Sequence, residues 1–504
     1  MDVWGNLLIG FQVALTPYNL LFCFLGCLLG TLIGVLPGIG PTAGVSILVP
    51  LTFGLPATTA FIVMAGLFYG AMYGGSTTAI LMNVPGEAAS VVTCLDGYQM
   101  ARQGRAGPAL GMAAFASFIA GTFAIILLTF TAIPLVTAAL AFGPPEYFAL
   151  AFMGLTLVTS LTGKSLLKGL MSAAFGIIIA CVGVDAMSGQ TRFTYGEIYL
   201  LDGLGFINVA VGLFALSEVM INIEKPMAEV YTRVKLSMKT LLPNRQDWKD
   251  SRGALARGSI IGFIIGALPG TGPTIASFIS YAAEKKFSKH PEKFGTGVIE
   301  GVAAPEGANN AAAQGSFVPM LTLGIPGSGV TAILLGALMV HGLRPGPMLM
   351  QNNPEFVWGL IASMYIGNVM LLVLNLPLLG LWVQLLRIPY RIIMPLIVTI
   401  SVTGIYATET TIFDLWVMLG FGVIGYLMRK LDFPLAPVVL AVVLGPLVEN
   451  SLKQSLVLSG GSLAIFVTRP ISAALMIVSL LLLLAPLFGN LWQKLREERP
   501  DFFN

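Results

Sequence analysis

Two short motifs of glycine, proline and threonine interrupt the apolar sequence, and their chemistry is that of anion binding by backbone groups. Residues 36–42, Leu-Pro-Gly-Ile-Gly-Pro-Thr, return as residues 268–274, Leu-Pro-Gly-Thr-Gly-Pro-Thr. The glycines allow a tight turn and a close approach of the backbone to a ligand. Proline suits the first turn of a helix, so Pro41 and Pro273 each predict a new helix. The free N–H groups and positive dipole end of such a helix favour an anion.

A second interruption follows each motif and adds hydroxyl and amide groups. Asn83-Val-Pro-Gly-Glu-Ala-Ala-Ser90 aligns with Gly324-Ile-Pro-Gly-Ser-Gly-Val-Thr331. Upstream, Gly74-Gly-Ser-Thr-Thr78 aligns with Gly315-Ser-Phe-Val-Pro319. Unwound carbonyls and helix C-terminal ends at such breaks coordinate Na⁺ in secondary transporters, and bare backbone at membrane depth is tolerated only where it lines a cavity.

These interruptions give two candidate sets of site residues. No Lys or Arg lies in any of them, and a basic side chain at mid-membrane would cost about 2.5–3.5 kcal/mol. An anionic substrate would therefore meet helix N-termini, hydroxyls and amides, with a co-bound cation. The predicted substrate-binding residues are Gly38, Gly40, Thr42, Ser76, Thr77, Asn83, Gly270, Gly272, Thr274, Asn309, Asn310, Ser316, Gly327 and Ser328, and the predicted cation-binding residues are Gly38, Asn83, Pro85, Gly270, Gly324 and Pro326.

Several of these residues have a structural alternative. A single Gly-Pro kink in a membrane helix is commonly structural, whereas two copies in matching positions favour a site. Asn309 and Asn310 either line a pore or bridge helices. Glu306 and Glu87 either couple a proton or cation, or cap a helix end. The four cysteines form no ligand pattern, and two histidines, His290 and His341, are too few for a zinc hydrolase.

Composition identifies the kind of chain that holds these breaks. The sequence has 504 residues, of which 56% are apolar and 10% charged, and its mean hydropathy is +0.86. Soluble domains carry roughly 25% charge, so this is an integral membrane protein with many spans. The net charge of +3 comes from basic residues in short loops, which predicts no nucleic-acid partner.

The loop charges place the second motif at the tip of a re-entrant hairpin. Residues 222–257 and 284–293 are rich in Lys and Arg, so both are predicted to be cytoplasmic. The apolar arms between them, 258–268 and 274–283, have about ten residues each and rise roughly 15 Å, half of a ~30 Å hydrocarbon core. Segment 258–283 therefore enters and leaves on one side, with its tip near the midplane.

Counting the crossings between the two motifs predicts that the second half is inverted. Five crossings separate them, near 58–100, 110–141, 147–161, 167–184 and 206–221, and an odd number reverses the orientation. The predicted fold is an all-α integral membrane protein of about 11–12 spans in two inverted-topology repeats, each with a re-entrant hairpin and a broken helix. Its parts are an N-terminal helix (1–18), repeat 1 (19–221, hairpin 20–55, broken helix 58–100), a cytoplasmic linker with an in-plane amphipathic helix (222–257), repeat 2 (258–449, hairpin 258–283, broken helix 296–340), and a C-terminal span with a cytoplasmic tail (450–504).

The combined motifs resemble one known family over nearly the whole chain. Besides the paired tips, they are Tyr73-Gly-Gly-Ser-Thr-Thr-Ala-Ile-Leu81, Asn83-Val-Pro-Gly-Glu-Ala-Ala-Ser90, Asp96-Gly-Tyr98, Pro305-Glu-Gly-Ala-Asn-Asn-Ala311, Leu323-Gly-Ile-Pro-Gly-Ser-Gly329 and Asp185 with Ser188-Gly189 and Arg192-Phe-Thr-Tyr-Gly196. This set resembles the large membrane subunit of tripartite tricarboxylate transporters (TctA-type).

The resemblance implies a bacterial inner-membrane subunit that works with a small membrane subunit and a periplasmic solute-binding protein. It implies uptake of a carboxylate, often citrate, driven by a cation gradient, with Na⁺ expected, no cofactor, and membrane lipid around the spans. The hairpins and broken helices are also similar to those of elevator-type carriers, an analogy of architecture.

Two other classes of function stay open from the sequence. A channel, or a carrier for another small organic anion that needs no binding protein, is the alternative, although no ring of charges is present. An intramembrane enzyme is not predicted, because no nucleophile has a base at plausible spacing.

Overall fold

The protein is almost entirely helical. The computed structural model describes residues 3–36, 40–139, 141–161, 165–185, 187–224, 241–385, 390–409 and 411–497. Within these ranges the sheet structure is one antiparallel pair, β1 (Gly183–Val184) and β2 (Thr191–Arg192). The predicted all-α class is confirmed. Predicted residue Gly38 and most of the predicted amphipathic helix lie outside the described residues.

Several helices match a membrane in length and composition, which confirms a multi-pass membrane protein. Among the described residues, seven segments are long and apolar enough to span. Whether the total is 11–12 crossings stays a prediction, because two short helices on either side of a break can share one crossing. The seven are Pro17–Val35, Ala57–Met82, Ala88–Ala138, Phe206–Glu224, Pro354–Asn375, Ile412–Lys430 and Ala436–Leu458, and shorter apolar helices include Gly40–Leu51 and Gly329–Val340.

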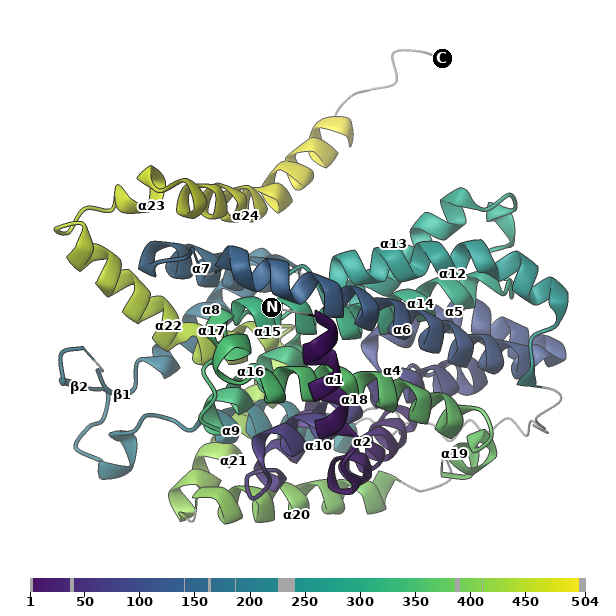
Figure 1. The fold of residues 1–504 in the computed structure, drawn as a ribbon, viewed down its shortest axis with the longest axis horizontal. Coiled ribbons are helices and arrows are strands. Elements are labelled where there is room, and N and C mark those ends of the chain that lie inside the picture. Colours follow the sequence, from purple (N-terminus) through teal and green to yellow (C-terminus); the bar gives the residue numbers. More distant parts are fainter. Residues whose placement is uncertain are drawn as a thin grey trace. The chain divides into compact units, whose positions relative to one another are not determined.

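The chain packs as two compact units. The first comprises Met1–Leu140 and Gly205–Leu427, and the second comprises Ala141–Leu204 and Met428–Asn504. This division into units does not test the predicted repeat boundaries, which stay predictions. Figure 1 labels the elements of both units.

The first unit contains both motifs. Its N-terminal part consists of α1 (Val3–Ala14), α2 (Pro17–Val35), α3 (Gly40–Leu51), α4 (Ala57–Met82), η1 (Ala88–Ser90), α5 (Val91–Met100), η2 (Ala101–Arg105) and α6 (Ala106–Ala139). Its later part consists of α9 (Phe206–Val211), η4 (Gly212–Leu216), α10 (Ser217–Glu224), α12 (Arg245–Gly266), α13 (Gly272–Phe287), η5 (Pro291–Lys293), α14 (Glu300–Gly315), α15 (Phe317–Leu323), α16 (Gly329–Val340), α17 (Pro347–Asn352), α18 (Pro354–Asn375), α19 (Leu379–Leu385), α20 (Tyr390–Glu409) and α21 (Ile412–Lys430).

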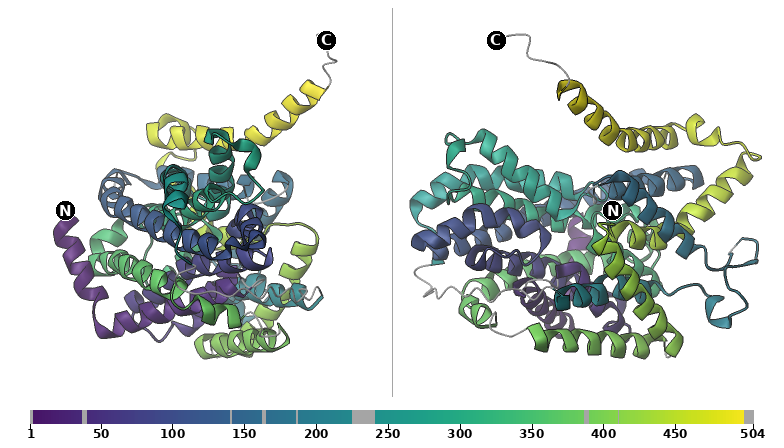
Figure 2. Two further views of the ribbon diagram at one scale, coloured as in Figure 1. Left: turned by 90° about the vertical axis from the view of Figure 1, so that its right-hand side faces the viewer. Right: turned by 180° about the vertical axis from the view of Figure 1, so that it is seen from behind.

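The first arm of the second hairpin is longer than the sequence pattern predicts. Helix α12 begins at Arg245, well before the predicted boundary at 258, because Asn244 and Asp247 form a reciprocal capping box there. Its first half is polar, so a search for apolar runs finds only its second half. Helices α12 and α13 lie side by side and pack on α14 (Figures 1 and 2). The re-entrant course of this hairpin stays a prediction.

Both hairpins pack on the following helix through matching ladders of glycine. On α2, Gly26, Gly30 and Gly34 face the backbone of Val63, Leu67 and Ala71 on α4. On α12, Gly258, Gly262 and Gly266 face the backbone of Ala304, Ala308 and Ala312 on α14. At all six glycines an added Cβ would overlap a carbonyl oxygen of the facing helix, as expected where small residues let two membrane helices meet. The two ladders correspond residue by residue.

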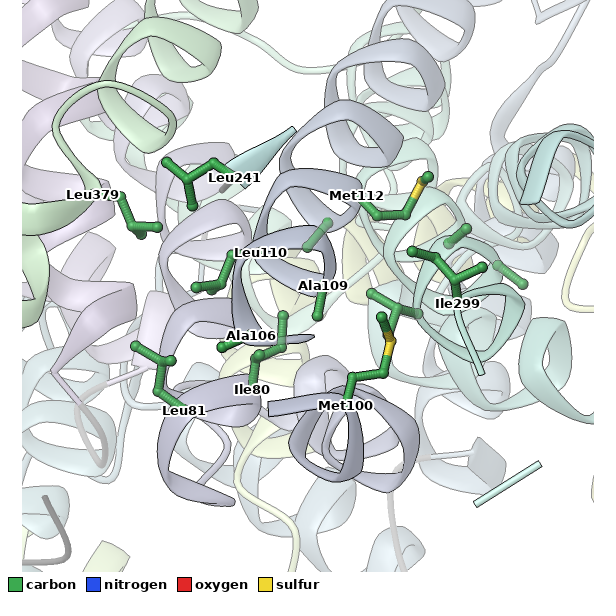
Figure 3. Packing of buried hydrophobic residues seen from close by; sticks show 14 of the residues in the cluster. Ile80, Leu81, Met100, Ala106, Ala109, Leu110, Met112, Leu241, Ile299 and Leu379 are labelled. Atoms are coloured by element: carbon green, nitrogen blue, oxygen red, sulfur yellow. The ribbon is translucent and has the colours of Figure 1, made fainter. Parts of the chain in front are cut away.

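A buried apolar cluster packs several helices of the first unit together. It joins the end of α4, the helices α5 and α6, and the start of α14. Figure 3 shows Ile80, Met100, Leu110 and Ile299 converging in this cluster. The packing holds α4, α5 and α14 together, and these are the elements that carry the polar residues described below.

In the second unit, ion pairs join the β hairpin to a neighbouring helix. It consists of α7 (Pro144–Leu161), α8 (Leu166–Ala180), β1, β2, η3 (Ile198–Leu200), α22 (Ala436–Leu458), α23 (Ile465–Thr468) and α24 (Pro470–Glu497). Arg192 binds Glu449 through both of its terminal nitrogens, at 2.5 and 3.1 Å. Lys453 binds both Asp185 and Glu449. The network ties the β hairpin to α22.

This network predicts how the β hairpin responds to acid. The Lys453 ammonium and the N–H groups of Met187 and Ser188 donate to Asp185, and they hold the pKa of its carboxyl below its ordinary value. The contact therefore stabilises the hairpin at every pH above about 3.9, and this stability is lost as the pH falls through the lowered pKa. We expect hydrogen-exchange protection of β1 and β2 to stay constant between about pH 8 and 5 and to fall only in stronger acid.

Two variants test the assignment of that response to one carboxylate. Asp185→Asn should have less protection than the native chain at every pH above about 3.9, because it removes the charge. Glu197→Gln removes a carboxylate from the exposed part of the same loop and should leave the protection unchanged. A hairpin whose protection is the same in Asp185→Asn as in the native chain would contradict the account.

Candidate functional site

Both breaks predicted from the sequence are present, and each begins at a residue with left-handed backbone. Helix α4 ends at Asn83, with φ of 57°, and α15 ends at Gly324, with φ of 71°. Asparagine and glycine are the residues that adopt this conformation most readily. After the breaks, Glu87 caps η1 and Ser328 caps α16. The Asn-Val-Pro-Gly-Glu and Gly-Ile-Pro-Gly-Ser sequences thus form equivalent structures.

The second hairpin tip lies directly on the second break. The N–H of Gly270 donates to the carbonyl oxygen of Pro326 at 3.1 Å. Gly272, with φ of 67°, lies against Ser328, where an added Cβ would be 3.3 Å from the serine Cβ. Gly327 packs more closely still against Ser316, where an added Cβ would be 2.7 Å from the serine Cβ. The structure therefore brings together six predicted residues of the second half.

The first break packs on the first hairpin in the same way. Gly86 lies against the carbonyl oxygen of Gly34, near the end of α2, and its N–H donates to the carbonyl of Gly75 at 3.4 Å. Of the predicted tip residues, Gly40 begins α3 with φ of 65° and Thr42 follows in its first turn. Thr274 holds the same place in α13. A single site formed by both tips stays a prediction.

Two buried carboxylates lie where the first break meets α14. Glu306 of α14 is 0% exposed, and its carboxylate accepts the hydroxyl of Ser76 at 2.6 Å and the hydroxyl of Thr93. Glu87 is 6% exposed and accepts the Asn309 amide at 3.2 Å and the Ala89 N–H at 2.5 Å. The predicted residues Ser76 and Asn309 are therefore partners of acids rather than isolated donors.

Asn310 extends this polar cluster to α6. Its amide nitrogen donates to Ser117 at 2.7 Å and to the carbonyl oxygen of Glu306 at 3.2 Å. Sequence reasoning missed Thr93 and Ser117, and an available signal was a hydroxyl on an apolar helix, which in a membrane protein needs a partner.

Thr77 lies beside the cluster, in a small cavity. The cavity has a volume of about 10 Å³, which is room for roughly one water molecule. Tyr73 also lines it, and the Tyr73 hydroxyl donates to the side-chain oxygen of Asn368 at 2.6 Å. The remaining lining residues are Ser76, Leu110, Ala113, Ala114, Asn375 and Leu379.

The two broken helices cross in opposite directions. Phe68 of α4 contacts Phe317 of α15, with ring centroids 6.0 Å apart. Ser76 follows Phe68 on α4, but its partner Glu306 precedes Phe317 in the second broken helix. The two broken helices therefore run antiparallel where they meet. No Lys, Arg or His occurs in α4, η1, α5, α6 or α14, so the crossing is polar and acidic without a basic partner on these helices.

The sequence of the chain is similar to those of known proteins. The family model "Tripartite tricarboxylate transporter TctA family" matches residues 20–440. The chain is 48% identical over 494 residues to the "Uncharacterized 52.8 kDa protein in TAR-I ttuC' 3'region" of Agrobacterium vitis, covering 98% of each chain. It is 46% identical over 233 residues to the "Uncharacterized protein in TAR-II ttuC' 3'region" of the same organism, covering 46% of this chain and 96% of the relative. No solved structure matches.

Proposed function

The chain belongs to the tripartite tricarboxylate transporter TctA family, and we propose that it imports a citrate-like carboxylate across the bacterial inner membrane by symport with Na⁺. Membership makes it a subunit of a multi-pass membrane transporter. The family implies two partners, a small membrane subunit and a periplasmic binding protein. In the proposal, the binding protein delivers the carboxylate to the outer face and the C-terminal tail is cytoplasmic.

The observation that carries the proposal is the paired construction of the two breaks. Matching glycine ladders seat both hairpins, equivalent caps at Asn83 and Gly324 end the first half of each broken helix, and the broken helices cross in opposite directions. Inverted repeats with discontinuous helices place substrate and ion sites near the bilayer midplane. The breaks are thus the proposed site, and rigid movement of hairpins with broken helices would be the elevator-like step.

The proposal predicts accumulation that depends on a sodium gradient. The chain, its small membrane subunit and the cognate binding protein would be assayed in proteoliposomes with a panel of labelled di- and tricarboxylates. We expect one carboxylate to accumulate above its external concentration under an inward Na⁺ gradient, because symport couples the two flows. A sodium ionophore should abolish this accumulation.

Three comparisons make the assay decisive. An equal gradient of K⁺ should give no accumulation, and a proton ionophore at zero membrane potential should leave it unchanged. Omission of the binding protein should reduce uptake, since delivery would be lost. Equilibration without accumulation, unaffected by the sodium ionophore, would instead indicate a channel and contradict the proposal.

A further inference from the structure

The two buried acids are surrounded by donors that stabilise charge but do not neutralise it. Two hydroxyls, from Ser76 and Thr93, donate hydrogen bonds to the Glu306 carboxylate. Such bonds favour the ionised form. The helices that build the cluster carry no basic side chain. An ionised carboxylate in a buried site without a positive partner is strongly unfavourable, so the cluster has a place for one positive charge.

Three amide oxygens on the same helix lack a donor. The side-chain oxygens of Asn309, Asn310 and Gln314 are buried without a hydrogen-bond partner, and each of these residues is 1% exposed. The amide orientations follow from their partners. A carboxylate only accepts, so Asn309 must present its nitrogen to Glu87, and its oxygen, on the same planar amide, is left beside that acid.

The spacing of these residues puts the free oxygens of Asn309 and Asn310 within about one helical turn of Glu306. Glu306, Asn310 and Gln314 stand four residues apart on α14 and therefore share one face of the helix, with Asn309 adjacent. The cluster thus combines carboxylate oxygens with amide oxygens that have no donor. Oxygen ligands of this kind suit a hard cation and exclude an anion.

The charge of the cluster favours a monovalent ion. Glu87 caps the N-terminus of η1, where its charge is already met by the N–H of Ala89 and the helix end. The charge left without a partner is that of Glu306. One positive charge balances it.

We propose that Glu306, Glu87 and the side-chain oxygens of Asn309 and Asn310 form a binding site for one Na⁺. The inference rests on the proposed function, for which this site would hold the coupling ion. It differs from the backbone site predicted from sequence at Gly270, Gly324 and Pro326. Its ligands come from the first break and from α14, so bound Na⁺ would join elements of both halves of the chain.

The site is tested by direct Na⁺ binding without substrate. The complex of this chain with its small membrane subunit, purified in detergent, would be titrated with ²²Na⁺ and with NaCl in thermal unfolding, KCl keeping the ionic strength constant. We expect saturable Na⁺ binding and a NaCl-dependent rise in Tm that K⁺ does not reproduce. Glu306→Gln keeps the size and one acceptor oxygen but removes the charge, so it should weaken Na⁺ binding about 100-fold or more.

Further variants separate a ligand from a structural residue. Asn309→Ala removes one oxygen and should weaken Na⁺ binding about tenfold. Glu306→Asp keeps the charge and should restore most of the binding. Glu300→Gln makes the same change on the same helix, at a partly exposed position in its first turn, and should bind Na⁺ like the native chain.

The outcomes for the site and for the carrier are distinguishable. Native Na⁺ affinity in both Glu306→Gln and Asn309→Ala would overturn the site, even if uptake by the native complex is sodium-driven. Absence of a Na⁺-specific response in the native complex, or stronger displacement of ²²Na⁺ by Mg²⁺ than by unlabelled Na⁺, would also overturn it. Loss of Na⁺ binding in Glu306→Gln supports the site, whether or not uptake by the native complex is sodium-driven. Uptake that is not sodium-driven would overturn only the proposed symport mechanism.

Discussion

Replacement of Gly262 by valine is expected to cause one of the largest losses of stability available from a single substitution in this protein. Gly262 on α12 faces Ala308 on α14, and a Cβ there would overlap the alanine carbonyl oxygen, a backbone atom that no rotamer change can move. The helices must separate to admit the side chain. Overpacking costs about 1–3 kcal/mol, and more where backbone must move. Separation would also shift Asn309 and Asn310, the next residues on α14.

The measurement is thermal unfolding of the purified complex in detergent, together with uptake in proteoliposomes. Gly262→Val should lower Tm sharply and abolish uptake, and Gly262→Ala should have a smaller effect in the same direction. Gly30→Val, at the matching place in the first ladder against Leu67, should behave like Gly262→Val. Equal sensitivity of the two positions would follow from their equivalent packing.

The matched control is a glycine that has free space. Gly420 lies inside helix α21, and an added Cβ there meets no atom within 4 Å. Gly420→Val therefore adds the same side chain to an apolar helix without a clash, and Tm and uptake should stay close to those of the native chain. A Gly262→Val protein as stable as Gly420→Val would refute the interpretation of the ladder as a tight contact.

Local chemistry explains why the breaks could be predicted. Asn83 and Gly324 take up left-handed backbone, and the Pro-Gly pairs that follow cannot continue a helix. The residues that cause each break therefore lie within a few positions of the break itself. The same holds for the starts of α3 and α13, which coincide with the Gly-Pro-Thr sequences of the tips.

The glycine ladders were also readable in principle. Gly26, Gly30 and Gly34 repeat every four residues, as do Gly258, Gly262 and Gly266, and this spacing is a known mark of close helix contact in membranes. The sequence does not say which helix each ladder faces. That partner depends on the course of the whole chain.

The start of α12 and the meeting of Glu87 with Glu306 could not be predicted from the sequence. Helix α12 begins at a polar capping box that hydropathy does not detect. Glu87 and Glu306 are far apart in the chain, and each has a local alternative as a helix cap, which Glu87 does adopt. Their meeting depends on the crossing of α4 with α14, a tertiary contact without a local signal. An acid within an apolar segment indicates function in general, but it does not reveal its partners.

Loss of Asp96 should open the segment that leads into α14. Asp96 on α5 is fully buried, and its carboxylate accepts the N–H groups of Gly295, Gly297 and Val298 at 2.8–3.1 Å and the Tyr281 hydroxyl at 2.8 Å. Asp96→Ala would leave these four donors without their acceptor. We expect a loss of about 3–5 kcal/mol, the range for removing one partner of a buried charged contact.

Trypsin cleavage can report on the segment Gly295–Val298, because Lys293 is exposed two residues before it. Trypsin should cut Asp96→Ala at Lys293 much faster than the native chain, since Gly295–Val298 would no longer be held against α5. Tyr281→Phe removes one of the four donors and should cost only about 1 kcal/mol, with a small rise in cleavage. Asp96→Asn should fall between the two, because an amide still accepts through its oxygen but lacks the charge. Cleavage at the native rate in Asp96→Ala would mean that another contact holds the segment. The nearest candidate is the Gln103 amide, which donates to the Thr296 carbonyl at 2.6 Å. In that case, Gln103→Ala combined with Asp96→Ala would release the segment.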